Sequence, residues 1–189
     1  MKGKLTKLEK FWILYDVGNS AFALLVSTII PIYFKNMAAA AGISDADSTA
    51  YLSYAISIST VIVAILGPTL GTLADNRNHK KPLFTFFMMM GVLGCAALSV
   101  PTAWLIFLVI FVLAKVGFAG SLIFYDSMLV DVTTDERMDE VSSHGYAWGY
   151  IGSCVPFIAS LVLILQADRI GISGTAAMGI AFLINAAWW

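Results

Sequence analysis

Polar side chains that stand inside long apolar stretches are the first candidates for chemistry in this chain. Asp16 and Asn19 lie three residues apart in the first stretch, and Lys115 and Asp126 lie eleven residues apart in a later one. On a helix, a spacing of three places both side chains on one face, and a spacing of eleven corresponds to three turns plus about 20°. Ionisable groups at membrane depth are costly and usually face a cavity or a partner. The pattern predicts a substrate or proton pathway, in which Lys115 meets a carboxylate and Asp16 or Asp126 meets an amine or carries a proton.

Two of these residues also have a purely structural interpretation, which the sequence leaves open. Asp16 could cap a helix near the lipid surface, and Lys115 could pair with a polar residue of another helix. Snorkelling is a poor alternative for Lys115, because this residue lies near the middle of its predicted span.

The composition is typical of an integral membrane protein. Of the 189 residues, 59% are hydrophobic and 12% are charged, and the mean hydropathy is +0.84. A soluble domain usually carries about 25% charged residues, and a helix needs about 20 apolar residues to cross the hydrocarbon core. The sequence predicts an all-α integral membrane protein, one domain over 1–189, with six transmembrane helices near 12–34, 51–74, 83–100, 102–128, 144–165 and 172–189.

Basic residues are distributed unevenly among the predicted connections. Two of them, Lys35 and Arg169, fall on one side, and eight fall on the other: Lys2, Lys4, Lys7, Lys10, Arg77, Lys80, Lys81 and Arg137. Because cytoplasmic connections carry the excess of Lys and Arg, we expect a cytoplasmic N-terminus. The predicted location is a bacterial inner membrane, or a vacuolar or plasma membrane if the chain is eukaryotic.

The connection at 71–81 reads Gly-Thr-Leu-Ala-Asp-Asn-Arg-Asn-His-Lys-Lys. A Gly-x-x-x-Asp stretch followed by basic residues after a second span resembles the signature loop of the major facilitator superfamily. Asn76 stands where that family has a basic residue, and Asn78 stands where it has glycine. The resemblance implies a conformational-switch loop that latches two halves of a transporter, with these residues in it: Gly71, Asp75, Arg77, Lys80 and Lys81. The plain alternative is a basic anchor loop.

Three further segments resemble one facilitator branch, the vacuolar amino-acid effluxer (autophagy-related) family and its bacterial relatives. They are residues 15–22, Tyr-Asp-Val-Gly-Asn-Ser-Ala-Phe, residues 124–132 and residues 141–152. The branch often has asparagine where Asp126 stands. The resemblance implies a secondary active transporter that moves a small solute, amino acids in that branch, by alternating access.

The resemblance also implies a partner. Facilitators have two pseudo-equivalent six-helix halves, so we expect this chain to form the N-terminal half. A C-terminal half absent from this chain, or a second copy, would then supply the partner of Asp75. Coupling to protons is left open. The alternative function is a non-transporting membrane scaffold or assembly protein, in which Lys115 joins subunits.

The predicted fifth helix is rich in residues that shape helix contacts: Gly145, Gly149, Gly152 and Pro156. Small residues allow helix backbones to approach closely, and proline favours a kink. In facilitators such a helix packs against the other half and bends during transport. Ordinary transmembrane glycines are the alternative.

Several function classes find no support in the sequence. The motifs expected of a metal site, a nucleotide-binding loop or a nucleophilic enzyme are missing, so no cofactor, metal, nucleic-acid partner or enzymatic activity is expected. Cys95 and Cys154 fall in apolar stretches, and both are predicted to be buried.

Overall fold

The structure, a computed structural model, describes residues 4–75, 77–100 and 102–189, without the side chain of Arg77. Lys2, Asn76 and the predicted turn at Pro101 lie outside the described residues. Regular secondary structure in the described part of the chain is entirely helical. Its elements are α1 (Lys7–Ser27), α2 (Ile29–Ala40), α3 (Asp45–Ala74), α4 (Arg77–Ala97), α5 (Trp104–Ser127), α6 (Leu129–Val132), η1 (Asp135–Arg137), α7 (Met138–Leu165), η2 (Asp168–Ile170) and α8 (Gly174–Trp188).

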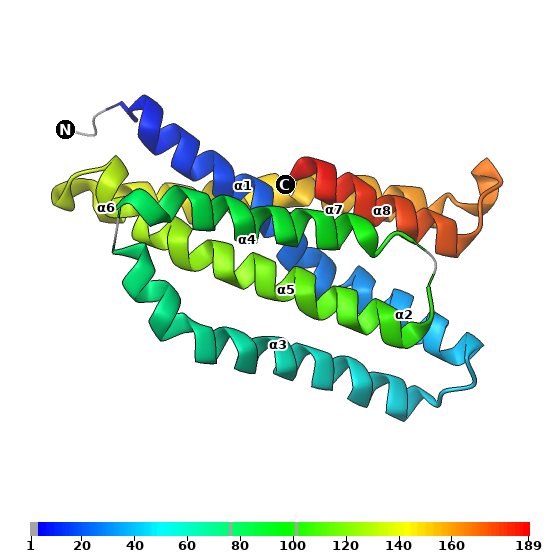
Figure 1. Cartoon of the computed structure of the whole chain (residues 1–189). Helices are drawn as coiled ribbons and strands as arrows, with labels where there is room; N and C mark the ends of the chain where they lie inside the picture. Colours follow the sequence, from blue (N-terminus) through cyan, green and yellow to red (C-terminus); the bar gives the residue numbers. More distant parts are fainter. Residues whose placement is uncertain (1–3, 76, 101) are drawn as a thin grey trace.

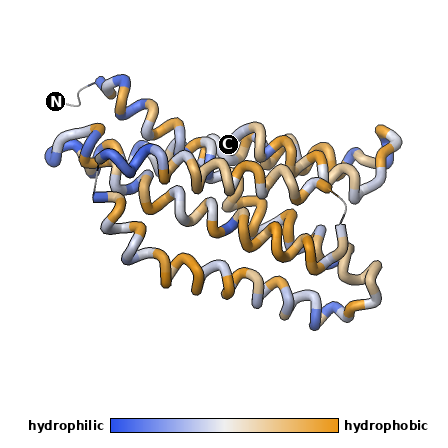
Figure 2. The backbone as a smooth tube through the Cα atoms, in the orientation of Figure 1, coloured by the Kyte–Doolittle hydropathy of each residue, from blue (hydrophilic) through white to orange (hydrophobic). Residues whose placement is uncertain are grey.

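The long helices run side by side in one bundle, with α3 along one edge (Figure 1). α4 and α3 pack along α5, α1 packs along α7, and α8 contacts α7 and α4. The first turn of α1, the end of α3, the start of α4 and α6 lie at one end, called the N-terminal end below, and the α2–α3 and α7–α8 connections lie at the opposite end. Figure 2 shows hydrophilic residues gathered at the ends, above all at the N-terminal end, and hydrophobic residues along the helices.

In the described part of the chain, four helical segments are long and apolar enough to cross a membrane. They are Lys7–Ala40, which comprises α1 and α2, then Asp45–Ala74, Trp104–Ser127 and Asp135–Leu165. α4 begins with a polar turn and α8 has 15 residues, so neither is among these four. The structure therefore supports a multi-pass membrane protein, while the count of six spans and their orientation stay predictions.

Polar capping residues extend the helices beyond the predicted spans. The prediction leaves 36–50 as a loop, yet α2 continues to Ala40 and α3 begins at Asp45. Ser44 Oγ accepts a hydrogen bond from the Asp47 amide at 3.1 Å, and the acidic side chains of the first turn favour a helix N-terminus. Apolar length alone cannot detect such polar first turns.

One buried cluster lies between α1, α2, α5 and α8, with contributions from α3 and α4, and six aromatic side chains belong to it. Tyr33 lies with its ring centroid 5.3 Å from that of Phe107 and 5.1 Å from that of Phe182, and both phenylalanines are fully buried. The backbones of α4 and α5 are in contact at Gly117. A Cβ added there would lie only 2.4 Å from the Gly91 nitrogen. Van der Waals packing of this kind stabilises helix association in lipid.

Candidate functional site

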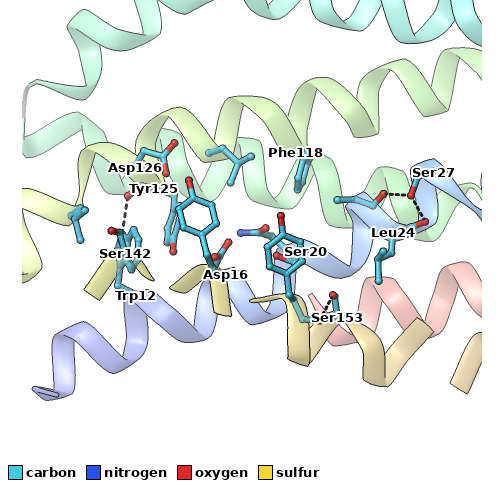
Figure 3. Close-up of a pocket in the computed structure, with 16 residues that line it drawn as sticks. Trp12, Asp16, Ser20, Leu24, Ser27, Phe118, Tyr125, Asp126, Ser142 and Ser153 are labelled. Carbon is cyan, nitrogen blue, oxygen red and sulfur yellow. Dashed lines mark hydrogen bonds between the residues drawn. The ribbon is translucent and has the colours of Figure 1, made fainter. Parts of the chain in front are cut away.

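A pocket of about 570 Å³ lies between α1, α5 and α7. Each helix contributes one face, because the lining positions recur at helical spacing. The lining residues are Trp12, Asp16, Asn19, Ser20, Ala23, Leu24 and Ser27 from α1, Phe118, Leu122, Tyr125 and Asp126 from α5, Leu129 from α6, and Ser142, Tyr146, Tyr150 and Ser153 from α7. Figure 3 shows the α1 and α5 side chains on either side of this space.

The pocket brings together three of the four residues predicted for the pathway. Asp16, Asn19 and Asp126 line it, whereas Lys115 is half-buried on α5 and is not among the lining residues. Lys115 precedes Phe118, a lining residue of α5, by about one turn. The structure therefore groups the two carboxylates and the amide, and it leaves the predicted role of Lys115 as a prediction.

Buried hydrogen-bond donors in the pocket lack partners. Asn19 is 2% exposed, and its Nδ2 has no hydrogen-bond partner among the described residues. Tyr125 is 4% exposed, and its hydroxyl is likewise without a partner in the described part of the chain. Buried polar groups are nearly always hydrogen-bonded, and exceptions point to a function. These two donors are therefore suited to hold a bound molecule.

Aromatic stacking holds Tyr125 in place. The Trp12 ring stacks on it with centroids 4.3 Å apart and planes 12° apart, and Trp12 Nε1 donates to the Tyr125 carbonyl at 3.0 Å (Figure 3). The Tyr15 hydroxyl donates to Ser121 Oγ at 2.7 Å, which anchors a further ring 4.9 Å from Tyr125. Sequence reasoning missed these aromatic residues. Trp12 lies four residues before Asp16 and so shares its helix face, but this spacing does not distinguish a site residue from an interface aromatic.

Glycines of α7 allow this helix to pack closely against α1 beside Asp16. A Cβ at Gly149 would lie 2.9 Å from Ser20 Oγ and 3.0 Å from Asp16 Oδ2, and a Cβ at Gly152 would lie 2.4 Å from Val17 Cγ1. A Cβ at Gly145 would lie 2.8 Å from the Trp12 ring. These close approaches form one wall of the pocket.

The rest of α7 is tied to α8. Pro156 is buried inside α7, and its carbonyl accepts a hydrogen bond from Ser160 Oγ at 2.7 Å. Asn185 Nδ2 of α8 donates in turn to Ser160 Oγ at 3.0 Å.

Cys154 is exposed on α7, so the prediction that both cysteines are buried is wrong for Cys154 and confirmed for Cys95. An apolar stretch in a membrane helix does not reveal which of its faces is covered by protein.

The residues of the predicted switch loop lie at the N-terminal end, but they do not form one cluster. Lys80 is buried, and its Nζ donates to Asp131 Oδ2 at 2.7 Å and to the Ser127 carbonyl at 3.0 Å, so it ties α4 to α5 and α6. Asp75 and Lys81 are exposed. A Cβ at Gly71 would meet nothing within 4 Å, and the side chain of Arg77 lies outside the described residues. The role of this loop as a latch stays a prediction.

A second buried carboxylate network lies at the same end and was not predicted. Glu9 is 1% exposed, and with Thr6 it forms a capping box at the start of α1. Thr133 Oγ1 donates to Glu9 Oε1 at 2.7 Å, and Arg137 Nη1 lies 3.3 Å from the same oxygen. The Thr-x-x-Glu spacing was a sequence signal for the cap, but nothing in the sequence pairs Glu9 with the α6–α7 connection.

The described residues offer no group of three or more His, Cys, Asp or Glu side chains placed to hold a metal ion. The pocket chemistry is instead that of carboxylates, an amide, hydroxyls and aromatic rings, which suits reversible binding of a solute.

Comparison with known proteins assigns the family. Residues 42–136 match the family described as vacuole effluxer Atg22 like. The chain belongs to this family. YxiO, described as an uncharacterized MFS-type transporter of Bacillus subtilis (strain 168), is 47% identical over 194 residues, which cover 100% of this chain and 45% of YxiO. An uncharacterized protein of Aquifex aeolicus (strain VF5) is 32% identical over 179 residues, which cover 92% of this chain and 42% of that protein.

The predicted resemblance to a facilitator of the effluxer type is thereby confirmed. This effluxer-like chain spans less than half the length of the two relatives. The matched range of the family spans positions 115 and 126, and the match to YxiO spans the whole chain. No solved structure matches the chain.

Proposed function

We propose that this chain forms the N-terminal six-helix half of a secondary active transporter, which moves a small solute through the α1–α5–α7 pocket by alternating access. The observation that carries the proposal is the pair of carboxylates, Asp16 and Asp126, beside the unpartnered amide of Asn19 in one pocket of a facilitator-type chain. Amino acids are the first solute class to test, because the resemblance to the vacuolar amino-acid effluxer family implies them.

The second half of the transporter is proposed to cover the outward faces of α3 and α7. α3 carries large exposed apolar side chains such as Ile58, Val61 and Ile65, and a Cβ at Gly67 would meet nothing within 4 Å. Small residues next to apolar ones permit close helix contact in lipid. A C-terminal half or a second copy would complete the pocket wall, and Gly71, Asp75 and Arg77 would then lie where a latch between halves can form.

Counterflow tests this proposal. Proteoliposomes that contain the native-length protein are loaded with the unlabelled amino acids, and each labelled amino acid is offered outside in turn. We expect accumulation of at least one of them, and we expect Asp16→Asn to reduce that flux to background, because the amide cannot replace a charge that contacts the solute. Asp168→Asn is the matched control, since Asp168 lies at the opposite end in η2. Normal flux in Asp16→Asn would remove Asp16 from the pathway.

A further inference from the structure

The charge of the pocket points to a particular class of solute. Asp16 and Asp126 supply two carboxylates, and the lining residues, all of them within the described part of the chain, include no Lys, Arg or His. Lys115 is the basic residue predicted for this pathway, and it is outside the lining set. Two carboxylates in a low-dielectric pocket are costly unless a cation is close to them. The wall that α1, α5 and α7 contribute to the pocket is therefore suited to contact a positively charged group.

Aromatic rings surround these carboxylates. Trp12 and Tyr125 line the pocket as one stacked pair, and Tyr146, Tyr150 and Phe118 add three more rings. An ammonium or guanidinium group over an aromatic face is attracted by the ring quadrupole, and the attraction increases when the group is desolvated. The combination of carboxylates and rings is the chemistry that recognises organic cations, and inorganic cations would instead need several oxygen ligands around one point.

A second, independent observation concerns the other end of such a solute. Asn19 is 98% buried, since its exposed fraction is 2%, and its unpartnered Nδ2 lies in the pocket lining three residues from Asp16. The buried Tyr125 hydroxyl is unpartnered in the described structure as well. An amide N–H₂ group donates and cannot accept. The Asp16 carboxylate is a nearby acceptor of the protein, and it makes no regular hydrogen bond to Asn19 Nδ2 in the described structure. A solute that carries an oxygen acceptor would satisfy this donor.

We propose that the solute is an organic cation that also bears an oxygen acceptor, as a basic amino acid does. Its protonated amine lies between Asp16 and Asp126 against the aromatic rings, and its acceptor receives the hydrogen bond of Asn19 Nδ2. This assignment rests on the proposed function, because it names the solute class of the same pocket.

Binding titrations with matched probes test the assignment. The native-length protein in lipid nanodiscs is titrated with lysine, norleucine, cadaverine and glutamate. Norleucine has the chain of lysine without the side-chain amine, and cadaverine has it without the carboxylate. We expect lysine to bind about tenfold to a hundredfold more tightly than norleucine, the usual range for a hydrogen bond to a charged group. Glutamate is expected not to bind.

Protein variants test the contacts of the solute's amine and of its oxygen acceptor separately. Asp16→Asn and Asp126→Asn are each expected to weaken the binding of both lysine and cadaverine about tenfold or more, whereas Asn19→Ala weakens lysine about fivefold and leaves cadaverine unchanged. Asp168→Asn serves as the matched carboxylate control, because Asp168 lies in η2 at the opposite end of the bundle.

Three results would overturn the assignment: equal binding of lysine and norleucine, tighter binding of glutamate than of lysine, or no binding of lysine and cadaverine. The last result would leave the carboxylates as proton carriers. Failure of the proposed function is separable from these results, because access to the pocket from both membrane faces can be measured without any solute. Two-sided access without amine selectivity overturns the organic-cation assignment alone, and one-sided access overturns transport.

Discussion

Gly149→Leu is expected to abolish solute counterflow. A Cβ at Gly149 would already lie 2.9 Å from Ser20 Oγ and 3.0 Å from Asp16 Oδ2, so the larger leucine side chain must push α7 away from α1 and displace the Asp16 carboxylate. Overpacking a close contact typically costs about 1–3 kcal/mol, and a loss of pocket geometry adds a loss of function. Counterflow in proteoliposomes and the thermal unfolding of the purified protein measure the two effects.

The same substitution at an open position is the control for Gly149→Leu. A Cβ at Gly174, the first residue of α8, would meet nothing within 4 Å, so Gly174→Leu is expected to retain both flux and thermal stability. Gly149→Ala should give an intermediate loss, because it adds only the Cβ. Wild-type flux in Gly149→Leu would show that α1 and α7 do not meet as the structure has them.

Glu9→Ala is expected to destabilise the N-terminal end of the bundle by about 2 kcal/mol. The substitution removes the capping box with Thr6, the acceptor of Thr133 Oγ1 and the ion pair with Arg137. A lost helix cap costs about 1 kcal/mol, and a buried donor left without its acceptor costs about 1–3 kcal/mol. Reversible unfolding in mixed micelles measures the change in the free energy of unfolding.

Two further variants divide that effect between charge and hydrogen bonding. Glu9→Gln keeps an oxygen acceptor for Thr133 and loses the charge, so it isolates the pair with Arg137. A double-mutant cycle with Arg137→Met then gives the coupling energy, provided that each single change removes only the intended interaction. If Glu9→Ala unfolds as the parent protein does, this network does not hold α1 to the α6–α7 connection.

The candidate site could be predicted in part, for a physical reason. Asp16, Asn19 and Asp126 are conspicuous because polar groups are rare and costly inside apolar stretches. Trp12, Tyr146 and Tyr150 carry no such signal, because aromatic residues also occur in membrane helices as interface anchors. Lys115 shows the limit of the argument, since its cost in lipid indicates a partner or a cavity but not which one.

The all-helical membrane fold could also be predicted, because length and hydropathy decide it. Apolar length does not reveal the helix limits, because they depend on polar caps such as Ser44 and Thr6 that lie outside the apolar stretches. The pairs Glu9–Arg137 and Lys80–Asp131 join residues far apart in the chain. Such pairs arise from the packing of whole helices, which neither spacing nor composition reveals.

Thiol labelling of one pocket residue tests alternating access most directly. Ser20→Cys is introduced into the native-length protein after Cys95→Ala and Cys154→Ala, and a membrane-impermeant maleimide is applied to right-side-out and to inside-out vesicles. Ser20 lines the pocket on α1, whereas Ile158, the control position for a second cysteine variant, is 56% exposed on α7 outside it. We expect labelling of Ser20→Cys from both faces and of Ile158→Cys from neither, because Ile158 lies outside the pocket, on a face of α7 that the second half or lipid covers. Labelling of Ser20→Cys from one face alone would contradict transport through this pocket.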